Sequence, residues 1–243
     1  MFYKKTLYIL TVILFLGTSG LWARDTATFV DLGFSPDSNT FMFAQYGVQA
    51  GTLRPWAELF IVDVPGNNFV SGGIMAYTHD SPVVFGQDGS GAFHSALVRN
   101  APIVERHRIN HSIQGRPLFI AHRVFGDQYL VCYVDNSISN MIEFRDFQTG
   151  ASYRATLVTM IEGSGAALRS SFHINVERQA RDGTRINYMV GSPHLSHPQV
   201  TSYRIRQVRV FGDAMIFIIE THRQEGGNIA VRYMVEALQR IPF

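Results

Sequence analysis

The chain has 243 residues, 46% of them hydrophobic, with 21 lysines and arginines against 19 aspartates and glutamates. Lys4 and Lys5 are the only lysines, so the rest of the chain carries 19 arginines against 19 carboxylates and is formally neutral. This composition excludes lysine Schiff-base chemistry and the lysine of a phosphate-binding loop. It also leaves no basic stripe for a nucleic-acid backbone, so we expect no nucleic-acid partner.

The first 23 residues have the pattern of a secretory signal peptide. Lys4 and Lys5 form a short charged region, residues 7–17 are apolar or small, and small residues recur up to Ala23. The apolar run is shorter than the roughly 20 residues that a membrane-spanning helix needs. We therefore expect cleavage of residues 1–23, no stable membrane span in the remaining chain, and a periplasmic or secreted location.

Residues 24–243 are expected to form a single β-rich secreted domain, because no Pro/Ser-rich linker or charge block interrupts them. Short segments of alternating apolar residues, rich in β-branched and aromatic side chains, are separated by Gly, Asn, Asp or Pro. These patterns predict strands at Phe41–Phe43, Glu58–Asp63, Tyr129–Val134, Met141–Phe144, Arg154–Met160, Phe172–Val176, Arg185–Val190, Tyr203–Phe211, Ala214–Glu220 and Ile229–Val235.

One segment departs from the strand pattern. Between Gly91 and Ile109, apolar residues recur every three or four positions, which predicts a helix near residues 91–109. Asp88 and Ser90 provide an N-terminal capping context, and Pro102 is expected to kink or restart the helix.

Three segments share a strand, a polar turn and a second strand: Thr40–Val64, Gln128–Leu157 and Ala214–Leu238. The segment Gly33–Asp37 also resembles the opening of a TolB-type propeller blade, because Ser-Pro-Asp makes a tight polar turn before a strand. Three such units are too few for a standard propeller. The predicted fold is mainly β, with propeller-like or sandwich-like antiparallel sheets and one helix.

The two ends of this region resemble a known family, the bacterial "predicted secreted proteins" that carry a domain of unknown function. At the N-terminal end the resemblance rests on Leu32–Asp37, Phe41, Phe43, Tyr46–Gln49, Pro55, Ala57–Glu58 and Val62–Asp63. At the C-terminal end it rests on Tyr203, Val208, the strand through Ile219, Glu225–Gly226 and the strand from Ile229. The resemblance implies secretion and carries no established activity.

The candidate binding surface lies around the glycine-containing loop expected at Ala44–Pro55. Tyr46, Arg54 and Trp56 lie in this loop or beside it, where exposed rigid side chains meet a ligand or partner. Glu58 belongs to the same N-terminal unit and is the carboxylate of this candidate surface.

Histidines are the only candidates for a metal site. His107 and His111 are four residues apart at the end of the predicted helix, and His122 follows, but surface histidines explain this pattern as well. His194 and His197 form a second pair, in an expected loop, with a metal-binding or pH-sensing role as the alternative to an exposed pair. We expect no metal and no cofactor.

No complete catalytic motif is present. The glycine-flanked serines Ser90 and Ser164 lack the spacing of a nucleophile elbow, and the single Cys132 lies in an apolar run that predicts a buried thiol. The leading hypothesis is a non-enzymatic exported module that binds a protein or envelope component through loops at one end of its sheets. The alternatives are an envelope hydrolase with a dispersed Asp/Glu/His site, or a carrier of a small ligand or metal.

Overall fold

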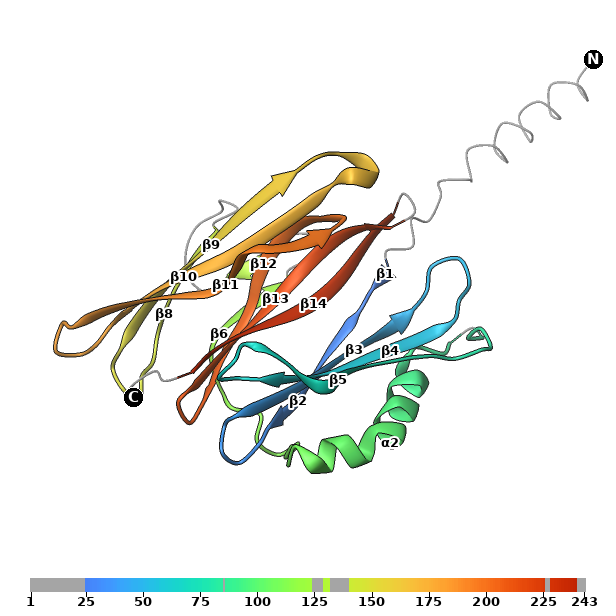
Figure 1. Cartoon of the computed structure of the whole chain (residues 1–243), viewed down its shortest axis with the longest axis horizontal. Coiled ribbons are helices and arrows are strands. Elements are labelled where there is room, and N and C mark those ends of the chain that lie inside the picture. Colours follow the sequence, from blue (N-terminus) through green and yellow to red (C-terminus); the bar gives the residue numbers. More distant parts are fainter. Residues whose placement is uncertain (1–24, 85, 124–128, 132–139, 226–227, 240–243) are drawn as a thin grey trace, which may run out of the picture.

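The computed structural model describes residues 25–84, 86–123, 129–131, 140–225 and 228–239, without the side chains of residues 122–123 and 129–131. It is mainly β, with one α-helix, as predicted (Figure 1). The predicted signal peptide and Cys132 lie outside the described residues.

Three sheets make up the β structure. The N-terminal sheet, called the helix-covered sheet below, has the order β2-β3-β4-β5, and every pairing in it is antiparallel. Its strands are β2 (Thr28–Phe34), β3 (Thr40–Val48), β4 (Pro55–Asp63) and β5 (Asn68–Thr78), and α2 (Ser90–Arg106) packs on it.

The second sheet, called the central sheet, has the order β1-β14-β13-β12-β6-β7, and β1 pairs parallel to β14. Its strands are β1 (Asp25–Thr26), β6 (Arg116–Arg123), β7 (Tyr129–Val131), β12 (Val200–Phe211), β13 (Ala214–Glu225) and β14 (Asn228–Gln239).

The third sheet, called the outer sheet, has the antiparallel order β11-β10-β9-β8. Its strands are β8 (Met141–Arg145), β9 (Ser152–Glu162), β10 (Arg169–Gln179) and β11 (Arg185–Pro198), and a 3-10 turn at Gly165–Ala167 connects β9 to β10.

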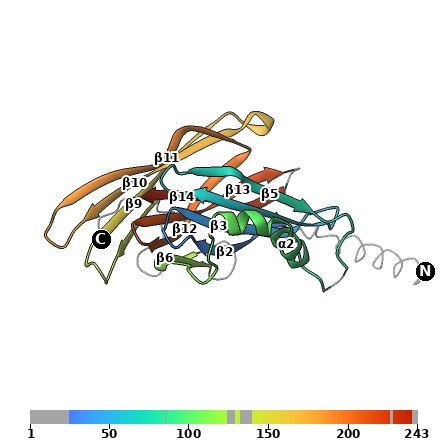
Figure 2. The same cartoon turned by 60° about the horizontal axis from the view of Figure 1, so that its bottom comes forward.

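The central sheet is buried on both faces, which explains the long apolar run of β13. Because side chains alternate between the faces of a sheet, every second residue contacts a different neighbour. The outer sheet covers one set, Met215, Phe217 and Ile219, and the helix-covered sheet covers the other, Ala214, Ile216 and Ile218. Figures 1 and 2 show the resulting stack of outer sheet, central sheet, helix-covered sheet and helix. Of the two predicted arrangements, this stack is the sandwich-like one.

The predicted helix is confirmed, although it ends at Arg106 rather than at Ile109. It buries Ala92, Phe93 and Ala96 against the helix-covered sheet, as the spacing of apolar residues requires. Pro102 lies inside α2. The chain leaves the helix early because Arg108 adopts a left-handed conformation, with φ of 54°.

Each predicted strand lies within an observed strand, apart from the second half of Tyr129–Val134, which lies outside the described residues. Three long strands, β2, β5 and β6, were not predicted. Gly72 and Gly73 interrupt the apolar pattern of β5, and Pro117 interrupts that of β6. In β2, Gly33 breaks the pattern for a packing reason, since a Cβ there would lie 2.4 Å from the carbonyl oxygen of Asn110.

Candidate ligand-binding cleft

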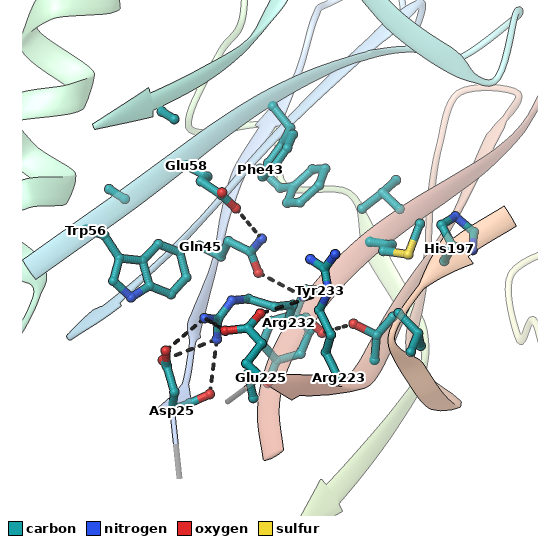
Figure 3. Close-up of a pocket in the computed structure, with 18 of the residues that line it drawn as sticks. Asp25, Phe43, Gln45, Trp56, Glu58, His197, Arg223, Glu225, Arg232 and Tyr233 are labelled. Atoms are coloured by element: carbon teal, nitrogen blue, oxygen red, sulfur yellow. Dashed lines mark hydrogen bonds and ion pairs between the residues drawn. The ribbon is translucent and has the colours of Figure 1, made fainter. Parts of the chain in front are cut away.

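A cleft of about 820 Å³ lies where the helix-covered sheet meets the open side of the central sheet (Figure 3). Strands β3, β4 and β5 form one wall, and the end of β11 with the adjoining parts of β12 and β13 forms the other. Strand β14 runs between the two walls. This volume falls within the range of roughly 300–1,000 Å³ that is usual for ligand sites.

The edge of β14 itself borders the cleft. All residues from Arg232 to Glu236 line it, although their side chains alternate between the two faces of the sheet. Lining by consecutive residues means that the cleft reaches the main chain of the strand. Strand β1 pairs with β14 only at Ala230 and Val231, so among the described residues β14 has no strand neighbour on this side beyond Val231.

The wall formed by the helix-covered sheet is aromatic. The Phe43 and Phe60 rings stack with centroids 4.7 Å apart, and the Phe69 ring lies 5.6 Å from that of Phe60. Phe69 at this wall and Leu195 at the opposite wall are 41% and 55% exposed. Large apolar side chains are therefore open to solvent on both sides of the cleft.

Charged side chains meet at the end of the cleft near β1. The Arg232 guanidinium donates to both carboxylate oxygens of Asp25, at 3.2 and 2.9 Å, and lies 3.5 Å from a carboxylate oxygen of Glu225. Its Cζ atom also lies 4.5 Å from the centroid of the Trp56 ring, which is a cation–π contact. Arg232 thus ties β14 to both β1 and β4.

Two side-chain amides bridge the helix-covered sheet to the edge of β14. The Tyr233 N–H donates to Gln45 Oε1 at 2.8 Å, and the Ala237 N–H donates to Asn67 Oδ1 at 2.6 Å. The other end of each amide donates to a carboxylate: Gln45 Nε2 to Glu58 at 2.8 Å, and Asn67 Nδ2 to Glu236 at 2.6 Å. Each amide is oriented by these two bonds and occupies a position that a neighbouring strand would otherwise fill.

Carboxylates outnumber guanidinium groups in the lining. Asp25, Glu58, Glu225 and Glu236 line the cleft together with Arg223 and Arg232. Burial raises the pKa of the Glu236 carboxyl, and the bond from Asn67 opposes that shift only in part. Even without a charge on Glu236, three carboxylates line the cleft against two guanidinium groups, so the cleft favours ligands that carry cations or hydrogen-bond donors.

A chain of hydrogen bonds joins Ser170 of β10 to His197 of β11 through Tyr203 of β12. Ser170 Oγ donates to the Val200 carbonyl at 2.8 Å and lies 2.7 Å from the Tyr203 hydroxyl, which lies 3.0 Å from His197 Nδ1. Because the Ser170 proton is used at Val200, the Tyr203 hydroxyl donates to Ser170 and accepts from His197 Nδ1–H.

This order of protons leaves His197 Nε2 as an acceptor. It is buried and has no hydrogen-bond partner among the described residues. Burial lowers the pKa of His197, and the nearby Arg223 lowers it further, so both favour the neutral ring.

Two of the four predicted binding residues, Trp56 and Glu58, line the cleft. Trp56 was expected to be exposed, but only 6% of it is, because it lies in β4 opposite Gly47 and under Arg232. Tyr46 lies in β3 and stacks on Phe93 of α2, with ring centroids 5.4 Å apart. Arg54 is exposed and is not part of the cleft lining.

The predicted loop Ala44–Pro55 is much shorter in the structure, because β3 continues to Val48 and β4 begins at Pro55. The uninterrupted apolar run of β3 ends at Ala44, but Tyr46 and Val48 continue an alternating pattern, and the backbone pairing with β4 also continues to Val48. The strand was predicted too short because Gln45 and Gly47 interrupt its apolar run, although the residues between and after them are apolar.

The structure does not bring the predicted metal ligands into one site. His107 follows the end of α2, and His111 Nδ1 lies 2.7 Å from the carbonyl oxygen of Leu32. The side chain of His122 lies outside the described residues. Among the residues that the structure does describe, no group of three or more His, Cys, Asp or Glu side chains could hold a metal ion.

His194 and His197 were expected in a loop, but both lie in β11. The two prolines around them suggested a break in the strand, whereas pairing with β10 resumes at His197, after a register shift between Ser170 and Phe172.

Several cleft residues were not predicted from the sequence: Asp25, Gln45, Asn67, Arg232 and Glu236. Gln45 carried one signal in the sequence, because it is a polar residue inside an apolar strand. In the structure it is only 4% exposed. A buried amide needs hydrogen-bond partners, which marks its position as a site where chain segments meet.

Over the described part of the chain, no helix has the length and apolar character needed to cross a membrane. A family model described as "Predicted secreted protein (DUF2259)" matches residues 42–239. The matched region includes β4, β5, β11 and all of β14, and thus most of the cleft lining. No curated protein matches the chain.

Proposed function

Because the chain belongs to the DUF2259 family of predicted secreted proteins, we propose that it is an exported binding protein whose ligand site is the cleft along β14. Residues 1–23 serve as its cleaved signal peptide in this proposal, and the remaining chain acts in the periplasm or outside the cell. An exported protein whose mass corresponds to cleavage after Ala23 is the expected product, and retention of the first 23 residues would contradict this part of the proposal.

The observation that supports binding most strongly is the composition of the cleft. It combines an aromatic wall with polar groups whose positions are fixed, namely Gln45, Asn67 and Arg232. Ligand sites in proteins share this pattern of apolar lining and a few oriented polar groups. The exposed Phe69 and Leu195 add apolar surface that a ligand would cover.

The cleft is tested with N-phenyl-1-naphthylamine, a neutral apolar dye that fluoresces on leaving water. Trp56 is the only tryptophan beyond residue 23, so energy transfer from it to the dye reports binding by the exported protein. Leu195→Ser is expected to weaken dye binding about fivefold, because Leu195 lines the cleft and loses apolar contact with the dye.

The matched control is Leu53→Ser, because Leu53 is 54% exposed and is not among the lining residues. It is expected to bind the dye as the unmodified protein does. Absence of dye binding, or equal loss in the two variants, would contradict the proposal.

An envelope hydrolase is the second candidate, because two groups with shifted pKa values line the same cleft. The pKa of Glu236 is raised and that of His197 is lowered, each mainly by burial. In this alternative Glu236 is the proton donor. Hydrolysis of a peptide, ester or glycan substrate that is lost in Glu236→Gln while dye binding persists would favour the hydrolase over the binding protein.

A further inference from the structure

We infer that the ligand of the cleft is an extended polypeptide segment, which adds alongside β14 and pairs with its main chain at Val235. This inference rests on the proposed function, because it names the ligand class of the same cleft. Three independent features support it: the orientation of the β14 main chain, the apolar surfaces on both sides, and the charge of the lining.

The first feature is a main-chain position left open between two occupied ones. The N–H groups of Tyr233 and Ala237 point away from β13, since they donate to Gln45 and Asn67 of the helix-covered sheet. Alternate residues of a strand direct their main-chain groups to the same side, so Val235 also directs its N–H and C=O into the cleft.

No strand pairs with β14 at Val235 on this side within the described ranges, and no other hydrogen-bond partner for these two groups is found there. One residue of an extended peptide can supply both missing bonds, by accepting from the Val235 N–H and donating to its carbonyl. The distance from Tyr233 to Ala237 along the strand is roughly 13 Å, which leaves room for one such residue and its two neighbours. Beyond these three residues the peptide leaves the edge of β14, because the Gln45 and Asn67 amides occupy the next positions.

The second feature is apolar surface on both sides of that position. Phe43, Phe60 and Phe69 lie on the side of the helix-covered sheet, and Leu195 lies on the side of β11. Side chains of an extended peptide point alternately to opposite sides, so successive residues would contact the two walls in turn. Strand addition in a groove with side-chain pockets is a common mode of peptide recognition.

The third feature is charge. Glu58 and Glu236 are held by amides rather than by guanidinium groups, and they lie on the two amide bridges that flank Val235. A peptide with basic residues on either side of its apolar centre would place its cations near these carboxylates. The occupant is therefore an apolar segment with basic ends.

The probe is the peptide acetyl-Lys-Val-Thr-Val-Thr-Val-Lys-amide, measured by displacement of N-phenyl-1-naphthylamine from the exported protein. Two N-methylated forms test main-chain pairing, one methylated at the three valines and the other at the two threonines. Only one set of alternate N–H groups can face β14, so one form is expected to bind as the parent does. The other is expected to lose about tenfold or more, the equivalent of one hydrogen bond.

The hydrogen exchange of the Val235 amide gives a second readout that needs no variant of the protein. Exchange at Val235 is expected to slow when the parent peptide binds, because its N–H then has a protein partner. Replacing both lysines of the peptide by glutamates is expected to weaken binding, and Leu195→Ser is expected to weaken it about fivefold, with Leu53→Ser as the matched control.

The outcomes separate this inference from the proposed function. Dye binding without displacement by the peptide, or equal binding of both methylated forms, would overturn strand addition while the cleft remains a ligand site. Displacement by a long-chain amine but by no peptide would assign the cleft to a lipid-like ligand instead. Failure of both dye and peptide to bind would overturn the proposed function as well.

Discussion

The Gln45 side chain allows a sharp test of how the cleft is built, since it joins three strands through one amide. It is 4% exposed and bonds to Glu58 of β4 and to the Tyr233 N–H of β14. Gln45→Ala removes the acceptor of the half-buried Tyr233 N–H, which costs about 1–3 kcal/mol, and the bond to Glu58, which contributes about 0.5–1.5 kcal/mol. We expect the free energy of unfolding to fall by about 2–4 kcal/mol, measured by urea denaturation followed by circular dichroism.

Gln49→Ala is the control, because Gln49 accepts a hydrogen bond from Thr52 in an exposed loop, and its removal is expected to change stability by less than about 0.5 kcal/mol. Gln45→Glu keeps the acceptor for Tyr233 but places two carboxylates together. Its stability is therefore expected to recover as the pH falls and one carboxylate gains a proton. Equal, small effects of Gln45→Ala and Gln49→Ala would refute the bridging role of Gln45.

Three further predictions concern titratable groups. Burial, and then Arg223, lowers the folded-state pKa of His197 from 6.5, so protonation of His197 disfavours the fold. The urea concentration at the unfolding midpoint is therefore expected to decrease as the pH is lowered past 6.5, and to decrease less in His197→Gln. The pKa of Glu236 is raised from 4.5, so its ionisation costs stability as the pH rises. Glu236→Gln is therefore expected to raise the thermal midpoint at about pH 8 and to leave it nearly unchanged at about pH 4. A larger increase at about pH 4 than at about pH 8 would contradict the burial argument. Arg116 donates to both oxygens of the buried Asp146, at 2.7 and 3.0 Å, so Asp146→Ala is expected to cost about 3 kcal/mol in urea denaturation, and a loss below about 1 kcal/mol would show the pair to be unimportant.

The strands that could be predicted from sequence are those whose buried side chains form a recognisable apolar pattern. Strand β13 is an uninterrupted apolar run because both faces of the central sheet are covered. Strand β5 escaped prediction because most of its side chains are exposed and two glycines lie in its middle. Its position comes from main-chain pairing with β4, which leaves no apolar pattern in the sequence.

The candidate site could be predicted only in part, for a similar reason. Trp56 and Glu58 were predicted from a local feature, the hairpin that contains them. The bridges from Gln45 to Tyr233 and from Asn67 to Glu236 join residues 188 and 169 positions apart, so no local spacing indicates them. Trp56 was expected to be an exposed anchor, and its burial depends on Arg232 from the last strand, which sequence spacing could not place.

The most direct test of the central claim is a map of amide chemical shifts in the exported protein on addition of N-phenyl-1-naphthylamine. The indole N–H of Trp56 gives one unambiguous signal, because no other tryptophan lies beyond residue 23. The cleft predicts changes at this signal, at the Val235 amide and around Leu195, with none at Val98, which is 76% exposed on α2. Changes centred on Val98, or spread evenly over the three sheets, would contradict a ligand site along β14.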